Sequence, residues 1–412
     1  MSVTNDGKEN VMVVVAAPIN PSVLYLWYLG FAAQIPWTII LVYLPLIESV
    51  LGGVLFSFAV GIAMGLACNI VRFLVVVFGR KFTFKVRVVW GSLCSAFFTF
   101  GFFIIVLIGS SADWPEGVAS IGFWLGLLVA LLGGAGNAQL MSTGYGISAM
   151  ISREKPIANS LFFFGQATAS AVCWPLKLIV ERMSSSVTIQ SGISMSSISL
   201  ISLSVIPLFV YRLVRFEAIT KPSDSPQTTL TWHNAKRVFL QVWFPCTCLW
   251  LTYFCTNLVT PGQLMLWTLP VTDSTSAYLT DSKLYRSLCS YTHLLADAIG
   301  KSILVLVSMS PGRIKAVLNF RYISHAAFFL LVVRFATVVL FFIPPSAAAP
   351  RFLFLAIFGL LNGFVASLCL SMSVHRSDPA DTDLTGYINS FIIINGLFAG
   401  SVSGMLVHAA TG

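Results

Sequence analysis

The sequence predicts an all-α integral membrane protein that crosses the bilayer eleven times. Of its 412 residues, 57% are apolar and only 9% are Asp, Glu, Lys or Arg, whereas a soluble domain carries about 25% charged residues. A soluble chain with so few charges could not cover its surface with polar groups. Apolar runs of about 20 residues, enough to span roughly 30 Å of hydrocarbon as a helix, recur along nearly the whole chain.

The apolar runs fall into a group of six and a group of five, separated by a polar connection that contains prolines and is typical of a linker. We expect an N-terminal segment over 1–22, a six-helix half over 23–212, a cytoplasmic linker over 213–237 and a five-helix half over 238–412. Proline inside several runs is compatible with a bundle in which neighbours satisfy the freed backbone groups. The expected helices cover 23–46, 54–78, 86–108, 118–142, 157–181, 190–212, 238–259, 287–308, 322–344, 350–373 and 385–408.

The distribution of basic residues orients the chain. With the N-terminus in the cytoplasm, the segments on that side hold 16 of the 24 Lys and Arg residues, and the segments outside hold four. Positively charged loops are retained in the cytoplasm, so we expect a cytoplasmic N-terminus and, after an odd number of spans, an extracellular C-terminus. Nucleic-acid binding needs basic residues on one solvated face. Here they lie in short loops, and we expect no nucleic-acid partner.

Sequence signatures of metal sites, cofactors and enzymes are missing. The eight cysteines lie almost entirely within apolar runs, and Cys246 and Cys248 are too close together for the usual zinc spacing. The sequence contains no Walker-type loop, no His-Glu-x-x-His and no Gly-x-Ser-x-Gly. We expect no metal, no cofactor and no ATP-driven step, and a membrane-embedded enzyme is a remote alternative.

Polar residues inside the spans are candidates for function, because such groups are costly in lipid. In the first span, Gln34, Pro36 and Trp37 interrupt an apolar stretch, and Trp37 offers a flat face on which a heterocycle can stack. The fourth span carries glycines and two amides on one face. Small residues let helices approach closely, and the amide of Gln139 both donates and accepts hydrogen bonds, which suits the edge of a base.

The eighth span holds the strongest candidates, Asp297 and Lys301. They are four residues apart, so they share one helix face and can pair. A charge pair in lipid gains little over apolar residues, so we expect this face to line the bundle interior or a watery cavity. Two interpretations are open: a structural staple between helices, or a ligand site in which Asp297 accepts hydrogen bonds from hydroxyls and Lys301 orients the ligand. His293, one turn earlier, is interpreted first as structural and alternatively as a proton-coupling group.

Five stretches share a pattern with one known family. In chain order they resemble the first, third, fourth to fifth, eighth and tenth to eleventh helices of the equilibrative nucleoside transporter family. Thr38 stands where that family usually has Asn, and Lys301 where it usually has Arg. The stretches are Leu29-Gly30 through Pro36-Trp37, Val86-Arg87 with Gly91-Ser92-Leu93, Gln139 and Gly144 followed by Gly165-Gln166, Asp297-x-x-Gly300-Lys301, and 361–369 with Pro379-Ala380 and Thr385-Gly386.

This resemblance implies a major-facilitator-like arrangement of six plus five helices and transport of nucleosides, sometimes nucleobases, by alternating access at the plasma membrane. It implies that Trp37 contacts the base, that Gln139 contacts its edge, and that Asp297 and Lys301 hold the ribose hydroxyls. The alternative function is transport of another small polar solute, such as a vitamin or a sugar, on a similar scaffold. Facilitative transport and transport coupled to protons are both compatible with the sequence.

Overall fold

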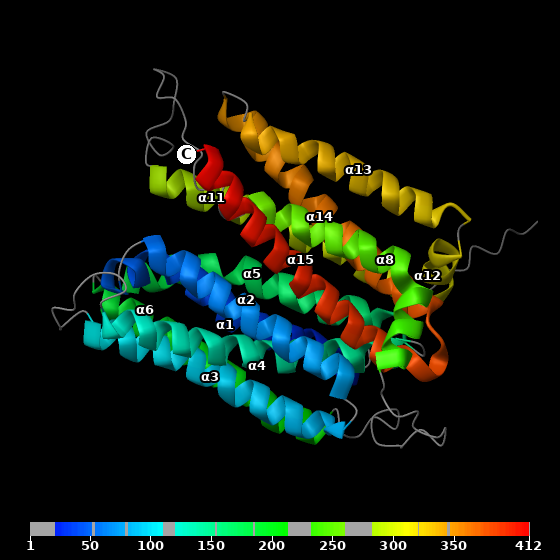
Figure 1. The fold of residues 1–412 in the computed structure, drawn as a ribbon, viewed down its shortest axis with the longest axis horizontal. Helices are drawn as coiled ribbons and strands as arrows, with labels where there is room; N and C mark the ends of the chain where they lie inside the picture. The colour runs from blue at the N-terminus through cyan, green and yellow to red at the C-terminus, as the bar shows by residue number, and fades with distance from the viewer. Residues whose placement is uncertain are drawn as a thin grey trace, which may run out of the picture.

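The computed structural model describes residues 21–51, 54–78, 81–109, 120–152, 155–183, 186–212, 232–259, 282–319, 321–343 and 347–411 (Figure 1). Within these ranges every regular element is a helix. Two helices are short, α12 (Pro311–Leu318) and η4 (Pro379–Asp381). The long ones are α1 (Pro21–Leu51), α2 (Val54–Phe78), α3 (Phe84–Gly109), α4 (Ile121–Ser152), α5 (Ile157–Met183), α6 (Val187–Arg212), α8 (Trp232–Val259), α11 (Ser282–Ser308), α13 (Ile323–Phe342), α14 (Ala348–Arg376) and α15 (Thr382–Thr411).

Eleven helices in the described part of the chain are long and apolar enough to cross a membrane, which confirms the predicted number. The largest difference in extent is in α4, which continues to Ser152, ten residues beyond the predicted end. Its last turns carry small and polar side chains that are buried by neighbouring helices. At Gly144 and Gly146 an added Cβ would overlap the rings of Phe162 and Tyr387. Close packing, which hydropathy does not register, therefore extends this helix.

The long helices pack in two groups. In the first, α1 lies against α5 and α6, α3 against α4 and α6, and α2 against α4. In the second, α11 lies against α14, α8 against α14 and α15, and α13 along α8 and α14. The groups meet where α11 contacts α5 and where α15 contacts α2 and α4. This is consistent with the predicted six-plus-five arrangement, while the predicted segments 1–22 and 213–237 lie largely outside the described residues.

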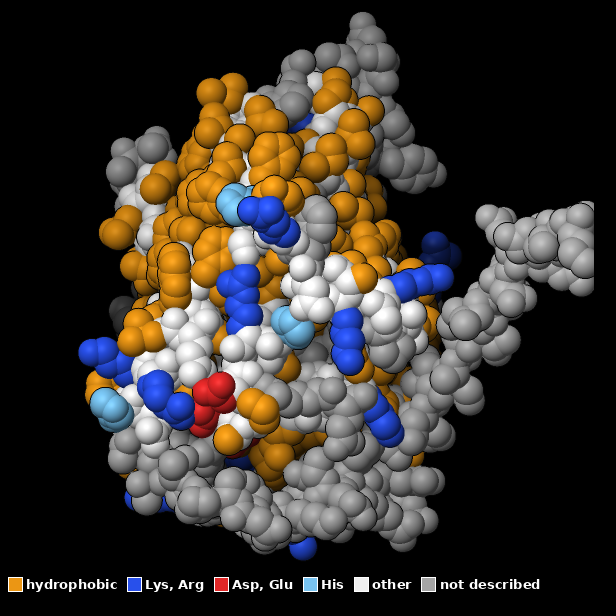
Figure 2. Space-filling model, turned by 90° about the vertical axis from the view of Figure 1, so that its right-hand side faces the viewer, with side chains coloured by type: hydrophobic (Ala, Val, Ile, Leu, Met, Phe, Trp, Pro, Cys, Tyr) orange, Lys and Arg blue, Asp and Glu red, His pale blue; other side chains and the backbone are white. Residues whose placement is uncertain are grey.

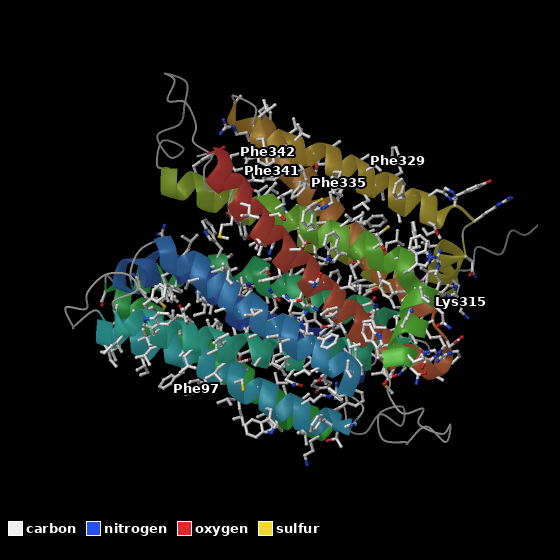
Figure 3. All side chains as sticks on the ribbon, viewed as in Figure 1. Phe97, Lys315, Phe329, Phe335, Phe341 and Phe342 are labelled. Carbon is white, nitrogen blue, oxygen red and sulfur yellow. The ribbon has the colours of Figure 1, made fainter. Side chains whose placement is uncertain are left out.

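The flanks of the bundle are apolar. Phe97 on α3 is 56% exposed and Phe329 on α13 is 66% exposed, and both point away from the neighbouring helices (Figure 3). Large exposed apolar side chains occur on most of the long helices. Such a surface would be unfavourable in water and is suited to lipid.

One end of the bundle is basic. Figure 2 shows Lys and Arg side chains gathered on this end, together with His and a small patch of Asp. It is formed by α12, by the starts of α3, α8 and α13, and by the end of α14 (Figure 1). We call it the basic end. Its exposed Lys and Arg residues are Lys81, Lys85, Lys236, Arg237, Arg313, Lys315, Arg321 and Arg376.

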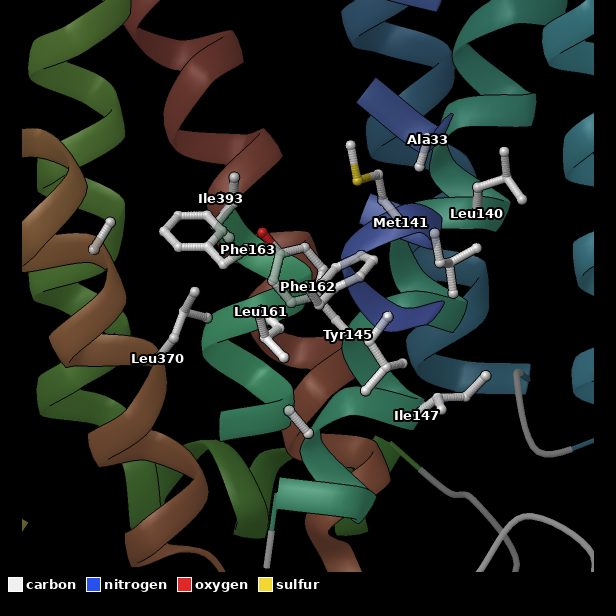
Figure 4. Packing of buried hydrophobic residues seen from close by; sticks show 14 of the residues in the cluster. Ala33, Leu140, Met141, Tyr145, Ile147, Leu161, Phe162, Phe163, Leu370 and Ile393 are labelled. Carbon is white, nitrogen blue, oxygen red and sulfur yellow. The ribbon is translucent and has the colours of Figure 1, made fainter. Parts of the chain in front are cut away.

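The largest buried cluster joins the two groups of helices. Tyr145, Phe162 and Phe163 from α4 and α5 belong to the same cluster as Leu370 and Ile393 from α14 and α15. Figure 4 shows part of this cluster, with Phe162 and Phe163 near its centre. The buried Lys301 of α11 lies over one of these aromatic rings, that of Phe163.

Candidate functional site

Asp297 and Lys301 form a buried ion pair in α11. The Nζ of Lys301 lies 2.6 Å from the Oδ2 of Asp297, and the two residues are 6% and 5% exposed. Glycines hold this part of α11 tightly against α14. An added Cβ at Gly363 would overlap the carbonyl oxygen of Asp297, and one at Gly300 would overlap the carbonyl oxygen of Leu360. The close packing fixes the backbone that carries the pair.

The second oxygen of the Asp297 carboxylate is also occupied. The side-chain nitrogen Nδ2 of Asn362, on α14, donates a hydrogen bond of 2.6 Å to Oδ1 of Asp297. Asn362 is itself buried and accepts a 2.9 Å hydrogen bond from the hydroxyl of Thr256 on α8. Three helices of the second group therefore act on one carboxylate. Sequence analysis did not single out Asn362, although it lies in the stretch 361–369 that carried the family resemblance.

Lys301 also faces the first group of helices. Its Nζ lies 4.3 Å from the centre of the Phe163 ring on α5, a distance typical of a cation–π contact. Toward the basic end, the hydroxyl oxygens of Ser160 and Ser308 are 3.2 Å apart. Toward the other end, the rings of Trp174 and Tyr291 stack with their centres 5.1 Å apart. Because residue numbers rise along α5 as they fall along α11, the two helices run antiparallel.

This register places Gln166 at the level of Asp297. Gln166 lies three residues beyond Phe163, on the same face of α5, and Asp297 lies four residues before Lys301. The side-chain oxygen of Gln166 accepts a 3.2 Å hydrogen bond from the Tyr145 hydroxyl, while its nitrogen Nε2 is buried and has no partner among the described residues. Gln166 is thus a site candidate that sequence analysis used only as part of the resemblance.

Trp37 and Gln139 have no described contact with the ion pair, and His293 lies one turn before Asp297 on α11 without a described hydrogen bond to it. Trp37 is half-buried and packs against a separate apolar cluster of the first helix group. Gln139 packs beside Gly91 of α3: a Cβ added at Gly91 would lie 3.1 Å from the Cβ of Gln139. The side-chain oxygen of Gln139 is buried and has no partner among the described residues. The His293 ring lies against the Phe358 ring, with centres 5.4 Å apart. The structure therefore brings together Asp297 and Lys301, and the roles of Trp37, Gln139 and His293 stay predictions.

The model of a protein family described as nucleoside transporter matches residues 129–409, about two thirds of the chain. The chain belongs to the nucleoside transporter family. It is therefore a multi-pass membrane transporter and not an enzyme, as the sequence predicted. Comparison of the sequence with curated proteins gives no match.

Solved structures show that the transporter has a major-facilitator-like fold. A bacterial homologue of the iron transporter ferroportin in its outward-facing state superposes with a TM-score of 0.64 at 12% identity, covering 94% of this chain and 92% of that one. The proton:xylose symporter XylE of the major facilitator superfamily, bound to 6-bromo-6-deoxy-D-glucose, superposes with a TM-score of 0.59 at 10% identity, covering 94% and 89%. At these identities the similarity concerns the fold alone.

The two helix groups of the transporter are in contact toward the basic end. Arg87 of α3 donates a 2.7 Å hydrogen bond to the Tyr387 hydroxyl of α15. Arg72 of α2 donates a 2.8 Å hydrogen bond to the carbonyl oxygen of Ser390, also in α15, and one of 2.9 Å to the side chain of Asn137. Arg72, placed within a span by the sequence, is therefore a structural residue that joins both groups. Together with Ser160 and Ser308, these contacts close the interface on that side of Asp297.

Proposed function

We propose that this transporter carries nucleosides, and nucleobases in the same site, by alternating access. The observation that supports this most strongly is the buried Asp297–Lys301 pair beside the interface of the two helix groups. A nucleoside presents a vicinal diol, and one carboxylate can accept hydrogen bonds from both hydroxyls. Such charge-assisted bonds are stronger than neutral ones. In this proposal Asp297 accepts from the ribose hydroxyls, and Lys301 leaves the carboxylate to donate to a ligand oxygen.

For the base we propose stacking on Trp37 and a hydrogen bond from an amide of the first helix group. Two amides compete for this role, Gln139 and Gln166. Each has one buried atom without a partner among the described residues, Oε1 of Gln139 and Nε2 of Gln166, which a ligand could satisfy. The position of Gln166 supports the second. Its level on α5, opposite Asp297, suits a ligand held by the carboxylate at the sugar and by the amide at the base.

We propose that the moving bodies are the halves 23–212 and 238–412, which rock about the site between them. The basic end would face the cytoplasm, since cytoplasmic segments retain Lys and Arg. Under this assignment the N-terminus is cytoplasmic, the C-terminus is extracellular, and the contacts of Arg72 and Arg87 close the cytoplasmic side. The plasma membrane is the proposed location.

We propose facilitative transport in preference to proton coupling. The position of the His293 ring against Phe358, with no hydrogen bond to Asp297 among the described residues, supports this choice. Proton coupling through His293 predicts that an imposed pH gradient drives accumulation above equilibrium and that His293→Gln removes it. Accumulation that depends on the gradient would overturn the facilitative assignment.

Radiolabelled adenosine uptake in a host that lacks nucleoside uptake tests the proposal. The unaltered protein should take up adenosine, and Asp297→Asn should abolish uptake at equal surface expression. Competition with unlabelled nucleosides, nucleobases, a sugar and a vitamin separates the substrate classes. Uptake of only the sugar or vitamin would replace the nucleoside assignment, and full adenosine uptake by Asp297→Asn would remove Asp297 from the site.

A further inference from the structure

Arg334 lies in the middle of α13 and is completely buried. Its exposed fraction is 0%, which is unusual for an arginine in any protein. One guanidinium nitrogen, Nη1, donates a 2.5 Å hydrogen bond to the carbonyl oxygen of Phe358, and the guanidinium carbon lies 3.9 Å from the centre of the Phe358 ring. No carboxylate forms a direct ion pair with Arg334 among the described residues. A buried cation without a counter-ion is costly, so its charge must be balanced less directly.

A chain of hydrogen bonds leads from Arg334 to Asp297. The Nη2 of Arg334 donates to the hydroxyl oxygen of Thr256 at 2.6 Å. Thr256 donates to the side-chain oxygen of Asn362 at 2.9 Å, and the side-chain nitrogen of Asn362 donates to Asp297 at 2.6 Å. We call these residues the relay. It joins α13, α8, α14 and α11.

The relay can have only one polarity. The guanidinium has donors and no acceptor, so it must meet the oxygen of Thr256. The ionised carboxylate has acceptors and no donor, so it must meet the amide nitrogen of Asn362, which leaves the amide oxygen for Thr256. The single proton of the Thr256 hydroxyl is shared between two acceptors at 2.9 Å, the amide oxygen of Asn362 and the carbonyl oxygen of Thr252. The charges at the two ends therefore orient the Asn362 amide and fix the rotation of the carboxylate.

Asp297 consequently interacts with two cations, Lys301 directly and Arg334 through Thr256 and Asn362. Lys301 reaches Oδ2 with a flexible side chain, whereas Arg334 acts on Oδ1 through Asn362. We propose that Arg334 is a positioning residue for substrate binding: through Thr256 and Asn362 it holds the Asp297 carboxylate in its orientation when Lys301 leaves it to bind the ligand. This inference rests on the proposed role of Asp297 and Lys301 in holding the ribose. Arg334 itself touches no ligand.

The test compares variants that interrupt the relay at different points. Arg334→Met removes the charge, Arg334→Lys keeps it without the forked geometry, and Thr256→Val removes only the bridging hydroxyl. Arg351→Met is the matched control, because Arg351 is also a buried arginine of the second helix group (4% exposed) but is hydrogen-bonded to Tyr285 at 3.3 Å, outside the relay. The KM and the maximum rate of tritiated adenosine uptake are measured per copy at the cell surface.

Arg334→Met should raise KM about tenfold, the effect of losing one charge-assisted hydrogen bond, with a smaller change in maximum rate. Arg334→Lys should restore part of the affinity, and Arg351→Met should leave KM unchanged. Because Thr256→Val breaks the same chain, combining it with Arg334→Met should raise KM no further.

Two outcomes would overturn the inference while leaving the proposed function intact. One is an unchanged KM in Thr256→Val. This variant keeps Arg334 in place, so it tests the relay even when Arg334→Met fails to reach the cell surface. The other is a KM in the double variant Arg334→Met/Thr256→Val that rises by the product of the two single-variant effects. That result would indicate two unrelated structural losses. Failure of the unaltered protein to take up adenosine would instead overturn the proposed function and the inference together.

Discussion

The carboxylate of Asp297 is held on both sides, by Lys301 at Oδ2 and by Asn362 at Oδ1, with both distances 2.6 Å. The first contact lies within α11 and the second crosses to α14. A carboxylate with both oxygens engaged is held in one orientation and costs less to bury than one with a single partner.

Removing the charge of Lys301 alone should lower both stability and uptake, whereas removing both charges of the pair should lower uptake only. Lys301→Met leaves a buried carboxylate short of a partner, and removing one member of a buried pair typically costs about 3–5 kcal/mol. We expect a lower melting temperature of the detergent-purified protein and little uptake. In the double variant Asp297→Asn/Lys301→Met the melting temperature should recover while uptake stays absent. Recovery of uptake in the double variant would show that the pair is a structural staple.

Gly363 should tolerate no side chain, because α14 lies directly against α11 there. The Cβ of Gly363→Ala would overlap the carbonyl oxygen of Asp297 and approach the backbone nitrogen of Lys301 to 2.8 Å. We expect a loss of about 1–3 kcal/mol, typical of overpacking, seen as a lower melting temperature. Gly61→Ala is the control, since no heavy atom lies within 4 Å of its added Cβ. An equal effect of both variants would contradict the packing described for α11 and α14.

A reversible crosslink between the helix groups should stop transport. The hydroxyl oxygens of Ser160 and Ser308 are 3.2 Å apart across the interface of α5 and α11. In Ser160→Cys/Ser308→Cys, oxidation should join the two thiols, seen as their loss from maleimide labelling of the denatured protein. Because alternating access requires this side to open, uptake should cease on oxidation and return on reduction. Each single variant is a control, and undiminished uptake with the crosslink formed would argue against rocking halves.

The two candidate amides should be separable by substitution. Gln166→Leu removes an unpartnered buried donor that lies level with Asp297, and we expect it to raise the KM for adenosine by about tenfold. Gln139→Leu changes a residue whose Cβ packs beside α3, and it should raise KM less. Measuring both variants together with Trp37→Ala decides the predicted base contacts. A larger effect for Gln139→Leu would indicate that Gln139 on α4, and not Gln166, contacts the edge of the base.

Local spacing predicted the ion pair, because residues four apart on a helix necessarily share a face. The eleven helices were predictable for a similar reason, since each needs only its own run of apolar residues. The partners of Asp297 were not predictable in this way. Asn362 comes from a helix distant in sequence, and its approach depends on glycine contacts between α11 and α14 that hydropathy does not encode. Arg334 comes from α13 and reaches Asp297 only through Thr256 and Asn362.

The burial of α4 explains why its sequence does not show which face lines the site. Beyond Leu132, buried residues lie all around this helix, including Gly136 facing α3, Asn137 facing α1 and Tyr145 facing α5. A helix that is covered on every side gives no apolar stripe from which an inward face can be read. The family resemblance included both Gln139 and Gln166, and only the packing of α5 against α11 distinguishes them.

The buried guanidinium in α13 has a consequence for biogenesis. An arginine at the centre of a membrane segment disfavours insertion by about 2.5–3.5 kcal/mol, and α13 holds one at Arg334. Its hydrogen-bond acceptors belong to α8, which is synthesised earlier, and to α14, which is synthesised later. Arg334 therefore gains its full set of hydrogen bonds only after α14 has been made and has packed beside α8 and α13.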